Sequence, residues 1–140
     1  MVQSINYLAS MADYVMPGEN EGKILCGSDD PAKIGDFYLQ NGAKTVIVKT
    51  GSDGAWAITK EQKLHVPAYV PKKIVDTVGA GDGFAAGVIS AVLEGLPLEK
   101  AILRGNAIGV IQIMNVSDNE GLPNREELSR FMAENEPKSY

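Results

Sequence analysis

The chain has 140 residues, of which 44% are hydrophobic and 22% charged, a size and composition typical of one folded domain with a sizeable core. Its formal net charge of −5 argues against nucleic-acid and anionic-membrane partners, because both attract clustered Lys and Arg. No apolar run approaches the roughly 20 residues of a membrane-spanning helix, and the lone Cys26 excludes a disulfide within the chain, which fits a reducing cytoplasm.

The first segment predicts a short helix, a small strand and a second helix. Apolar residues recur at helical spacing between residues 5 and 12, and a β-favouring run at 14–16 ends at Pro17-Gly18. Glu19 and Glu21 fall in the first turn of the next expected helix, where acids complement the helix dipole. A helix with no strand before it is an odd start for an α/β domain, so we expect a longer parent chain.

A helix and a buried strand are expected next. Asp30 and Pro31 are typical of a helix start, and Asn41-Gly42 is typical of a helix end. The nearly continuous β-branched run at 44–49 is typical of a strand buried in a parallel sheet. A helix followed by a buried strand implies a crossover unit. We therefore predict a Rossmann-like α/β fold with a mainly parallel sheet flanked by helices.

A sharp turn and a hairpin follow that strand. The turn at 50–54 lies at the carboxyl end of the strand, where open α/β sheets bind ligands, and a plain turn explains its residues equally well. Residues 55–59 and 64–67 flank a polar turn and predict an antiparallel pair. His65 is the only histidine and has no metal-site spacing, so we expect a simple role in its strand.

A glycine-rich stretch at 75–84 separates a β-favouring run, 73–75, from residues with a helical period. Its glycines therefore lie at a helix N-terminus, where backbone N–H groups lack intrahelical partners. Gly79 to Asp82 are predicted to form a nest for a phosphoryl group, with Gly81 in a conformation that branched residues resist. Asp82 places a carboxylate beside this nest, where it can accept a proton from an alcohol.

Other readings of the glycine-rich stretch were compared with its spacing. Phe84 stands where a dinucleotide-binding fingerprint needs its third glycine, and no Gly-Lys-Ser/Thr follows for a P-loop. Both motifs are excluded. Helix capping stays open, because Asp is a good N-cap residue and glycines are common in tight turns between strand and helix.

Three helices are expected in the remainder of the chain. The first covers 83–93 and the second 98–114, and small residues at 105–109 in the second allow close packing or close approach of a ligand. Packing is the interpretation that the residues alone favour. The last helix is expected at 125–133, with a flexible tail at 135–140.

The stretch Asp76-Thr77-Val78-Gly79-Ala80-Gly81-Asp82-Gly83-Phe84 resembles the C-terminal signature of the ribokinase-like (PfkB) carbohydrate kinases. That signature usually reads Asp-Thr-x-Gly-Ala-Gly-Asp, followed by a small residue and Phe. The resemblance implies that Asp82 is the catalytic base. It also implies an anion hole formed by Gly79, Ala80, Gly81 and Asp82. Because only the C-terminal half of the family matches, residues 1–140 are expected to be a single partial domain, the nucleotide-binding and anion-hole half of a ribokinase-like fold.

Weaker matches imply further site residues. Pro17-Gly18-x-x-Glu21 resembles the family's Pro-Asn-x-x-Glu, which assigns Glu21 to the magnesium and phosphate region. A Lys-x-Gly-x-x-Gly segment and a helical Asn with small neighbours lie beside the nucleotide in the family. The nucleotide contacts implied in this chain are Thr50, Gly51, Asn106 and Gly109.

A monovalent cation is a further implication of the resemblance. Some members hold such an ion between the loop before the last helix and the start of the central motif. The corresponding candidate potassium site involves Asp76 and Val78 and faces the loop at 117–123, where Ser117 replaces the family's frequent Gly. The implied cofactors are therefore ATP, Mg2+ and, as a candidate, K+.

The resemblance implies ATP-dependent phosphorylation of a sugar or sugar-acid hydroxyl. The Pro-Gly-x-x-Glu variant and the loop at 119–123 resemble kinases of keto-deoxy sugar acids, which makes 2-keto-3-deoxygluconate the leading substrate. Fructokinase-like or other PfkB specificity is one alternative, and an inactive nucleotide-binding fragment is another. We expect the isolated chain to form homo-oligomers through its unpaired surface and to show little kinase activity, because the family's sugar contacts lie mostly outside the matched half.

Overall fold

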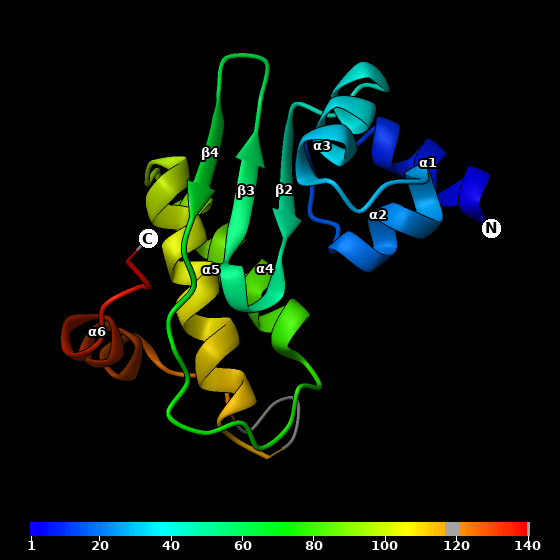
Figure 1. The fold of residues 1–140 in the computed structure, drawn as a ribbon. Coiled ribbons are helices and arrows are strands. Elements are labelled where there is room, and N and C mark those ends of the chain that lie inside the picture. The colour runs from blue at the N-terminus through cyan, green and yellow to red at the C-terminus, as the bar shows by residue number, and fades with distance from the viewer. Residues whose placement is uncertain (117–120, 140) are drawn as a thin grey trace. The chain divides into compact units, whose positions relative to one another are not determined.

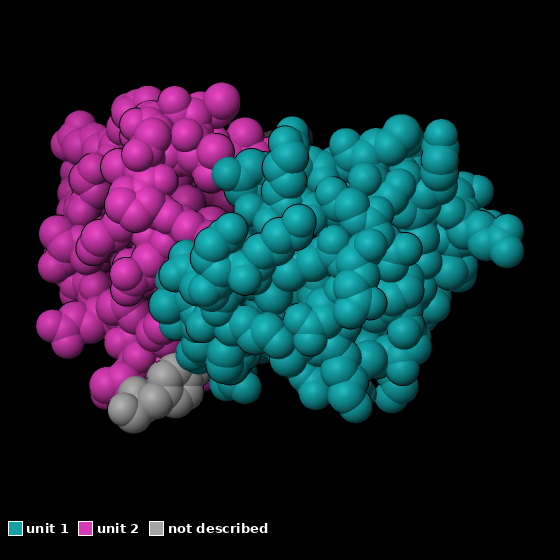
Figure 2. Space-filling view, turned by 90° about the horizontal axis from the view of Figure 1, so that it is seen from above, with its two compact units in different colours: residues 1–65 teal, residues 66–140 magenta. Residues whose placement is uncertain are grey.

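Helices and short strands follow one another in the predicted order. The computed structural model describes residues 1–116 and 121–139, and the chain divides into two compact units, 1–65 and 66–140 (Figure 2). The helices are α1 (Val2–Ser10), α2 (Glu19–Cys26), α3 (Pro31–Gln40), α4 (Ala80–Leu93), α5 (Leu98–Ile113) and α6 (Arg125–Glu134) (Figure 1). The strands are β1 (Tyr14–Val15), β2 (Thr45–Lys49), β3 (Ala55–Ile58) and β4 (Lys63–Val66), with a 3-10 turn, η1 (Gly51–Asp53). Within the described ranges, every helix is too short or too polar to cross a membrane.

The strands form one mixed sheet in the order β1-β2-β3-β4. β1 runs parallel to β2, with Tyr14 opposite Thr45, whereas β2 and β3 are antiparallel, with Val46 opposite Ile58. The prediction of a mainly parallel sheet is therefore wrong. Parallel neighbours need a crossover of a dozen or more residues, and the short turn that contains η1 connects β2 to β3 directly.

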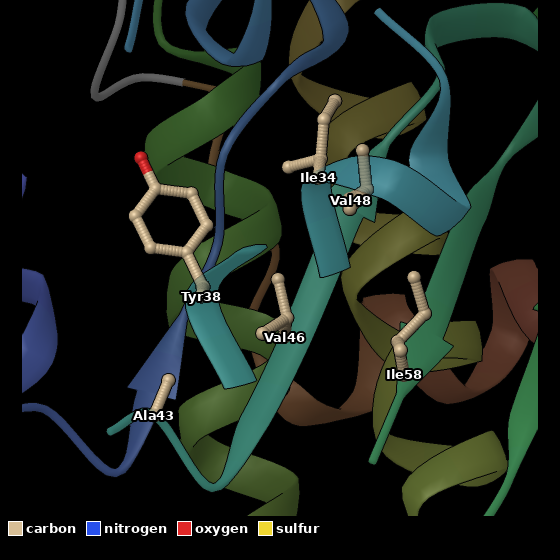
Figure 3. Close-up of a cluster of buried hydrophobic side chains, with 6 residues drawn as sticks. All are labelled: Ile34, Tyr38, Ala43, Val46, Val48 and Ile58. Carbon is tan, nitrogen blue, oxygen red and sulfur yellow. The ribbon is translucent and has the colours of Figure 1, made fainter. Parts of the chain in front are cut away.

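The buried face of the sheet in residues 1–65 packs against α3 (Figure 3). Ile34 and Tyr38 lie one turn apart on α3 and are 0% and 1% exposed. Val46 and Ile58 are cross-strand partners, so both point to the same face. A side chain at Gly35 would clash with Ile58, so the glycine lets the two backbones approach. The whole cluster consists of Ile34, Tyr38, Ala43, Val46, Val48 and Ile58.

The β-favouring run at 73–75 forms no strand. The backbone N–H groups of Val75 and Asp76 both donate to the Ile113 carbonyl, at 2.8 and 3.3 Å. These bonds fix the segment to the C-terminal end of α5 and use two of the donors that a strand needs. The β-branched composition thus indicates an extended segment, but its pairing partner is a helix end.

The C-terminal part folds back onto the segment that follows β4. The rings of Tyr69 and Phe131 meet edge to face, with centroids 5.4 Å apart. The Lys138 N–H donates to the Ala68 carbonyl at 2.9 Å, and Pro137 is bridged to Tyr69. The predicted looseness of this tail in solution stays a prediction.

Glycines bring α4 and α5 into close contact. A Cβ at Gly87 would lie 2.8 Å from the Gly105 Cα, and a Cβ at Gly105 would lie 2.9 Å from the Phe84 carbonyl oxygen. Neither position has room for a side chain, because the obstacle is backbone. For Gly105 this confirms the packing interpretation of the small residues in α5.

Gly105→Ala should therefore destabilise the protein by about 1–3 kcal/mol, the usual cost of overpacking, although alanine is the better helix former. Gly109→Ala is the matched control on the same helix, because a Cβ there meets the Ala80 carbonyl oxygen at an ordinary 3.4 Å. Urea unfolding followed by circular dichroism measures both. Equal stability of the two variants would contradict the packing argument.

Glu94 joins three helices through two arginines. Its carboxylate contacts Arg104 at 2.9 Å and Arg125 at 2.8 Å, so the end of α4 is fixed to α5 and to the start of α6. The hydrogen bond from Arg104 lowers the pKa of Glu94 below its ordinary value, and the charges of both arginines add to this effect against a smaller opposing effect of desolvation.

This lowered pKa makes part of the stability pH-dependent. A carboxyl whose pKa is lower in the folded state contributes stability above its unfolded pKa and loses that contribution as pH falls through the folded pKa. Glu94→Gln should thus cost stability at neutral pH, and the difference from wild type should shrink in acid. Urea unfolding over a pH series measures this, and Glu126→Gln, which removes an exposed pair with Arg130, is the control. A difference that stays constant with pH would contradict the assignment.

Candidate functional site

The glycine-rich stretch forms the first turn of α4. Gly79 is the N-cap residue and has a left-handed backbone, with φ 80°. The Gly83 N–H donates to the Gly79 carbonyl at 2.8 Å, whereas the Gly81 and Asp82 N–H groups have no backbone acceptor in the described part. Both of these residues are exposed. The predicted nest thus has open donors, but the helix begins three residues earlier than the expected 83–93.

The glycine requirement lies at Gly79 and not at Gly81. We expected Gly81 to need a conformation that branched residues resist, but Gly81 is the second residue of α4 and is helical. The left-handed residue is the one that turns the chain into the helix. A Cβ is strained there whatever the space around it.

Asp82 occupies the third position of α4, so the alternative that it serves as the N-cap is wrong. Its carboxylate is exposed and makes no hydrogen bond or ion pair within the part of the chain that the structure describes. Negative charge is favourable in the first turn of a helix. An open carboxylate beside open N–H groups is the arrangement that the base role requires, and that role stays a prediction.

Asp76 shapes the approach to this turn. Its Oδ1 accepts a hydrogen bond from the Val78 N–H at 3.0 Å, which closes a local turn just before Gly79. Residues 117–120, which include the loop position expected to face a potassium ion, lie outside the described residues. The candidate site at Asp76 and Val78 therefore stays a prediction.

Helix α5 supports the first turn of α4. A Cβ at Gly83 would lie 3.2 Å from Ile108 Cγ2, so the usual larger residue of the family needs only a small shift of a side-chain end. Gly109 faces the Ala80 carbonyl. Asn106 is 6% exposed, and its Nδ2 donates to the carbonyls of Pro67 at 3.0 Å and Val66 at 3.3 Å. These bonds fix the backbone after β4, and the predicted nucleotide role of Asn106 stays untested.

Glu21 caps α2, as the helix-dipole alternative predicts. Its Oε2 accepts the Gly18 N–H at 2.6 Å. This is half of a capping box, because glycine has no side chain to return the bond. The same oxygen lies 3.9 Å from Lys49 Nζ, and the Lys49 N–H donates to the Pro17 carbonyl at 2.8 Å.

Sequence reasoning missed Lys49. Its signal was its place as the last residue of a buried strand, directly before Thr50 and Gly51. Thr50 Oγ1 is buried and has no hydrogen-bond partner, and space around Gly51 is open, with φ 57°. Within residues 1–65 the structure thus brings Glu21 to Lys49, next to the predicted nucleotide contacts. No cluster of three His, Cys, Asp or Glu side chains that can hold a metal occurs among the described residues.

The sequence profile of the pfkB family carbohydrate kinases matches residues 1–125. The chain belongs to the PfkB family. It is 46% identical over 133 residues to the 2-dehydro-3-deoxygluconokinase of Bacillus subtilis, covering 95% of this chain and 41% of that relative. It is also 35% identical over 103 residues to the 5-dehydro-2-deoxygluconokinase of Geobacillus thermodenitrificans, covering 74% of this chain and 31% of that relative.

Solved PfkB-type structures share this fold. A PfkB protein from Polaromonas is 41% identical, with a TM-score of 0.78, covering 92% of this chain and 40% of that one. A ribokinase II candidate from Escherichia coli, in complex with ATP and Mg2+, is 28% identical, with a TM-score of 0.86, covering 94% and 42%. The chain therefore spans about two-fifths of the length of these relatives, and the PfkB resemblance is confirmed.

Gly79→Ala tests the entrance to α4. A left-handed backbone costs a residue with a Cβ about 1–2 kcal/mol, so this variant should be destabilised by that amount. Gly81→Ala, in the helical position two residues later, should be neutral or stabilising. Thermal and urea unfolding compare the two. The reverse order would show that the turn relaxes without its left-handed residue.

Proposed function

We propose that a protein containing this chain transfers the γ-phosphoryl group of ATP to a hydroxyl of a sugar or sugar acid. The observation that carries the proposal is the open Asp82 carboxylate beside the free N–H groups of the first turn of α4. The identity to the B. subtilis 2-dehydro-3-deoxygluconokinase supports a keto-deoxy sugar acid as acceptor, the same compound as 2-keto-3-deoxygluconate.

Asp82 and the nest have separate tasks in this reaction. The Asp82 carboxylate accepts the proton of the attacking hydroxyl, which makes the alcohol oxygen a better nucleophile. The N–H groups of Gly81 and Asp82 donate to the oxygens of the transferring phosphoryl group, where negative charge is spread. The left-handed turn at Gly79 aims these donors outward from the helix. Positioning and charge stabilisation supply most of the catalysis of phosphoryl transfer.

The residues of the first unit fit ATP with Mg2+. Mg2+ is usually held by one or two carboxylates together with phosphates and water, and Glu21 offers one oxygen beyond the one that caps α2. The buried Thr50 hydroxyl lacks an acceptor, and Gly51 leaves its surroundings open. When bound, Mg2+ neutralises charge on the phosphates. K+ at Asp76 and Val78 is a further proposal.

A coupled assay of ATP consumption tests the function. The chain is assayed alone and fused to the part of the B. subtilis relative that the match leaves uncovered, with 2-keto-3-deoxygluconate, fructose, ribose and a 5-dehydro-2-deoxygluconate sample as acceptors. We expect the fusion to prefer 2-keto-3-deoxygluconate and the chain alone to be nearly inactive. A fusion that folds, binds ATP and phosphorylates none of them would favour the inactive nucleotide-binding alternative. Sedimentation of the same preparations checks the predicted homo-oligomer.

Asp82→Asn in the active fusion should lower turnover by about 10²-fold or more, the scale of a general base. ATP affinity should change little, because the nest is backbone. Asp29→Asn, an exposed aspartate paired with Lys23, is the control. Initial rates and nucleotide titration separate the two effects. Near-normal turnover of Asp82→Asn would remove it from the base role.

A further inference from the structure

Three elements converge on Glu21 at the carboxyl end of the parallel strand pair. β1 ends in Pro17-Gly18, α2 begins with Gly18 as its N-cap, and β2 ends at Lys49. The Lys49 N–H to Pro17 carbonyl bond continues the β1–β2 pairing to this point. The carboxyl edge of a parallel pair is where open α/β sheets bind ligands.

The Lys49 ammonium lies in this edge without a close acceptor. Its side chain is only 28% exposed, and its ion pair with Glu21 Oε2 is 3.9 Å long. A charge-assisted N–H···O bond is about 2.7–2.9 Å, so the pair is a contact between charges and not a hydrogen bond. Glu21 Oε2 is already held by the Gly18 N–H at 2.6 Å. The three N–H donors of Lys49 therefore make no hydrogen bond within the described residues.

We propose that Lys49 is an exchangeable counter-ion of this site. In the free protein it neutralises Glu21, and when nucleotide binds it moves to an oxygen of the polyphosphate and leaves Glu21 unneutralised for the magnesium region. The idea rests on the proposed function, because it needs a polyphosphate ligand. Lysine suits this exchange, since its ammonium is a compact charge on a flexible four-carbon stem.

Charge arithmetic gives the exchange a signature that simple loss of structure lacks. Without Lys49, an uncompensated Glu21 repels the polyphosphate most strongly when no Mg2+ is present. Without the Glu21 charge, Lys49 is free from the start, and metal-free nucleotide should bind more tightly. The two single variants should therefore shift metal-free affinity in opposite directions, while Glu21→Gln also weakens the dependence on Mg2+.

The test is calorimetric titration of ATP into the 140-residue chain and into the fusion, with EDTA or with saturating Mg2+. Lys49→Met keeps the stem and removes the charge, and it should raise the metal-free Kd by about 10-fold or more, the scale of a hydrogen bond to a charged group. With Mg2+ the increase should be smaller. Lys49→Arg should restore most of the affinity. Lys23→Met is the matched control, since Lys23 lies on α2 and pairs with Asp29 at 3.6 Å.

The outcomes separate the exchange from the proposed function. Opposite shifts for Lys49→Met and Glu21→Gln, with Lys23→Met unchanged and all melting temperatures close to wild type, support the exchange. If wild type binds ATP and Lys49→Met binds equally well, or loses the same factor with and without Mg2+, the exchange is wrong and the kinase proposal stands. If neither wild-type protein binds ATP, both are overturned.

Discussion

The contact between α4 and α5 at Gly87 and Gly105 fixes the helix on which the candidate base lies. A helix that meets its neighbour backbone to backbone cannot slide or rotate without a clash. Further along α5, Ile108 and Gly109 contact the first turn of α4. The close contact in the helix centre therefore sets the position of Asp82 and of the open N–H groups beside it, several residues away.

The two candidate regions use helix starts in different ways. At α4, a left-handed glycine begins the helix, and no side chain caps it, so the first-turn donors stay open. At α2, the Glu21 carboxylate takes up the Gly18 N–H, so an acid stabilises the helix start and also lies next to Lys49. An open start suits an anion, whereas an acid-capped start suits a cation. This contrast follows from the residue at the third helical position only when its contacts are known, because Asp82 and Glu21 occupy equivalent places.

Local composition predicted the helices and strands well, because helical spacing, Asp30-Pro31 and Asn41-Gly42 act within a few residues. What it missed depends on contacts distant in sequence. The run at 73–75 is β-favouring, yet its donors meet the Ile113 carbonyl at the end of α5. The antiparallel β2–β3 pair follows from the length of one turn. The assignment of the strained glycine to Gly81 failed because the exact first residue of α4 decides which glycine is left-handed.

The glycine at position 18 gives the Pro-Gly-x-x-Glu variant a physical meaning. An Asn there accepts a hydrogen bond from an N–H of the first turn through its own side chain, whereas Gly18 supplies no such acceptor. The start of α2 then keeps an additional open donor, and the nearby Lys49 adds a full positive charge held only loosely by Glu21. Both changes make this edge of the sheet more positive than the Asn variant does. A site that must hold a polyphosphate beside an acidic acceptor benefits from that charge, because like-charged ligands otherwise repel each other at short range.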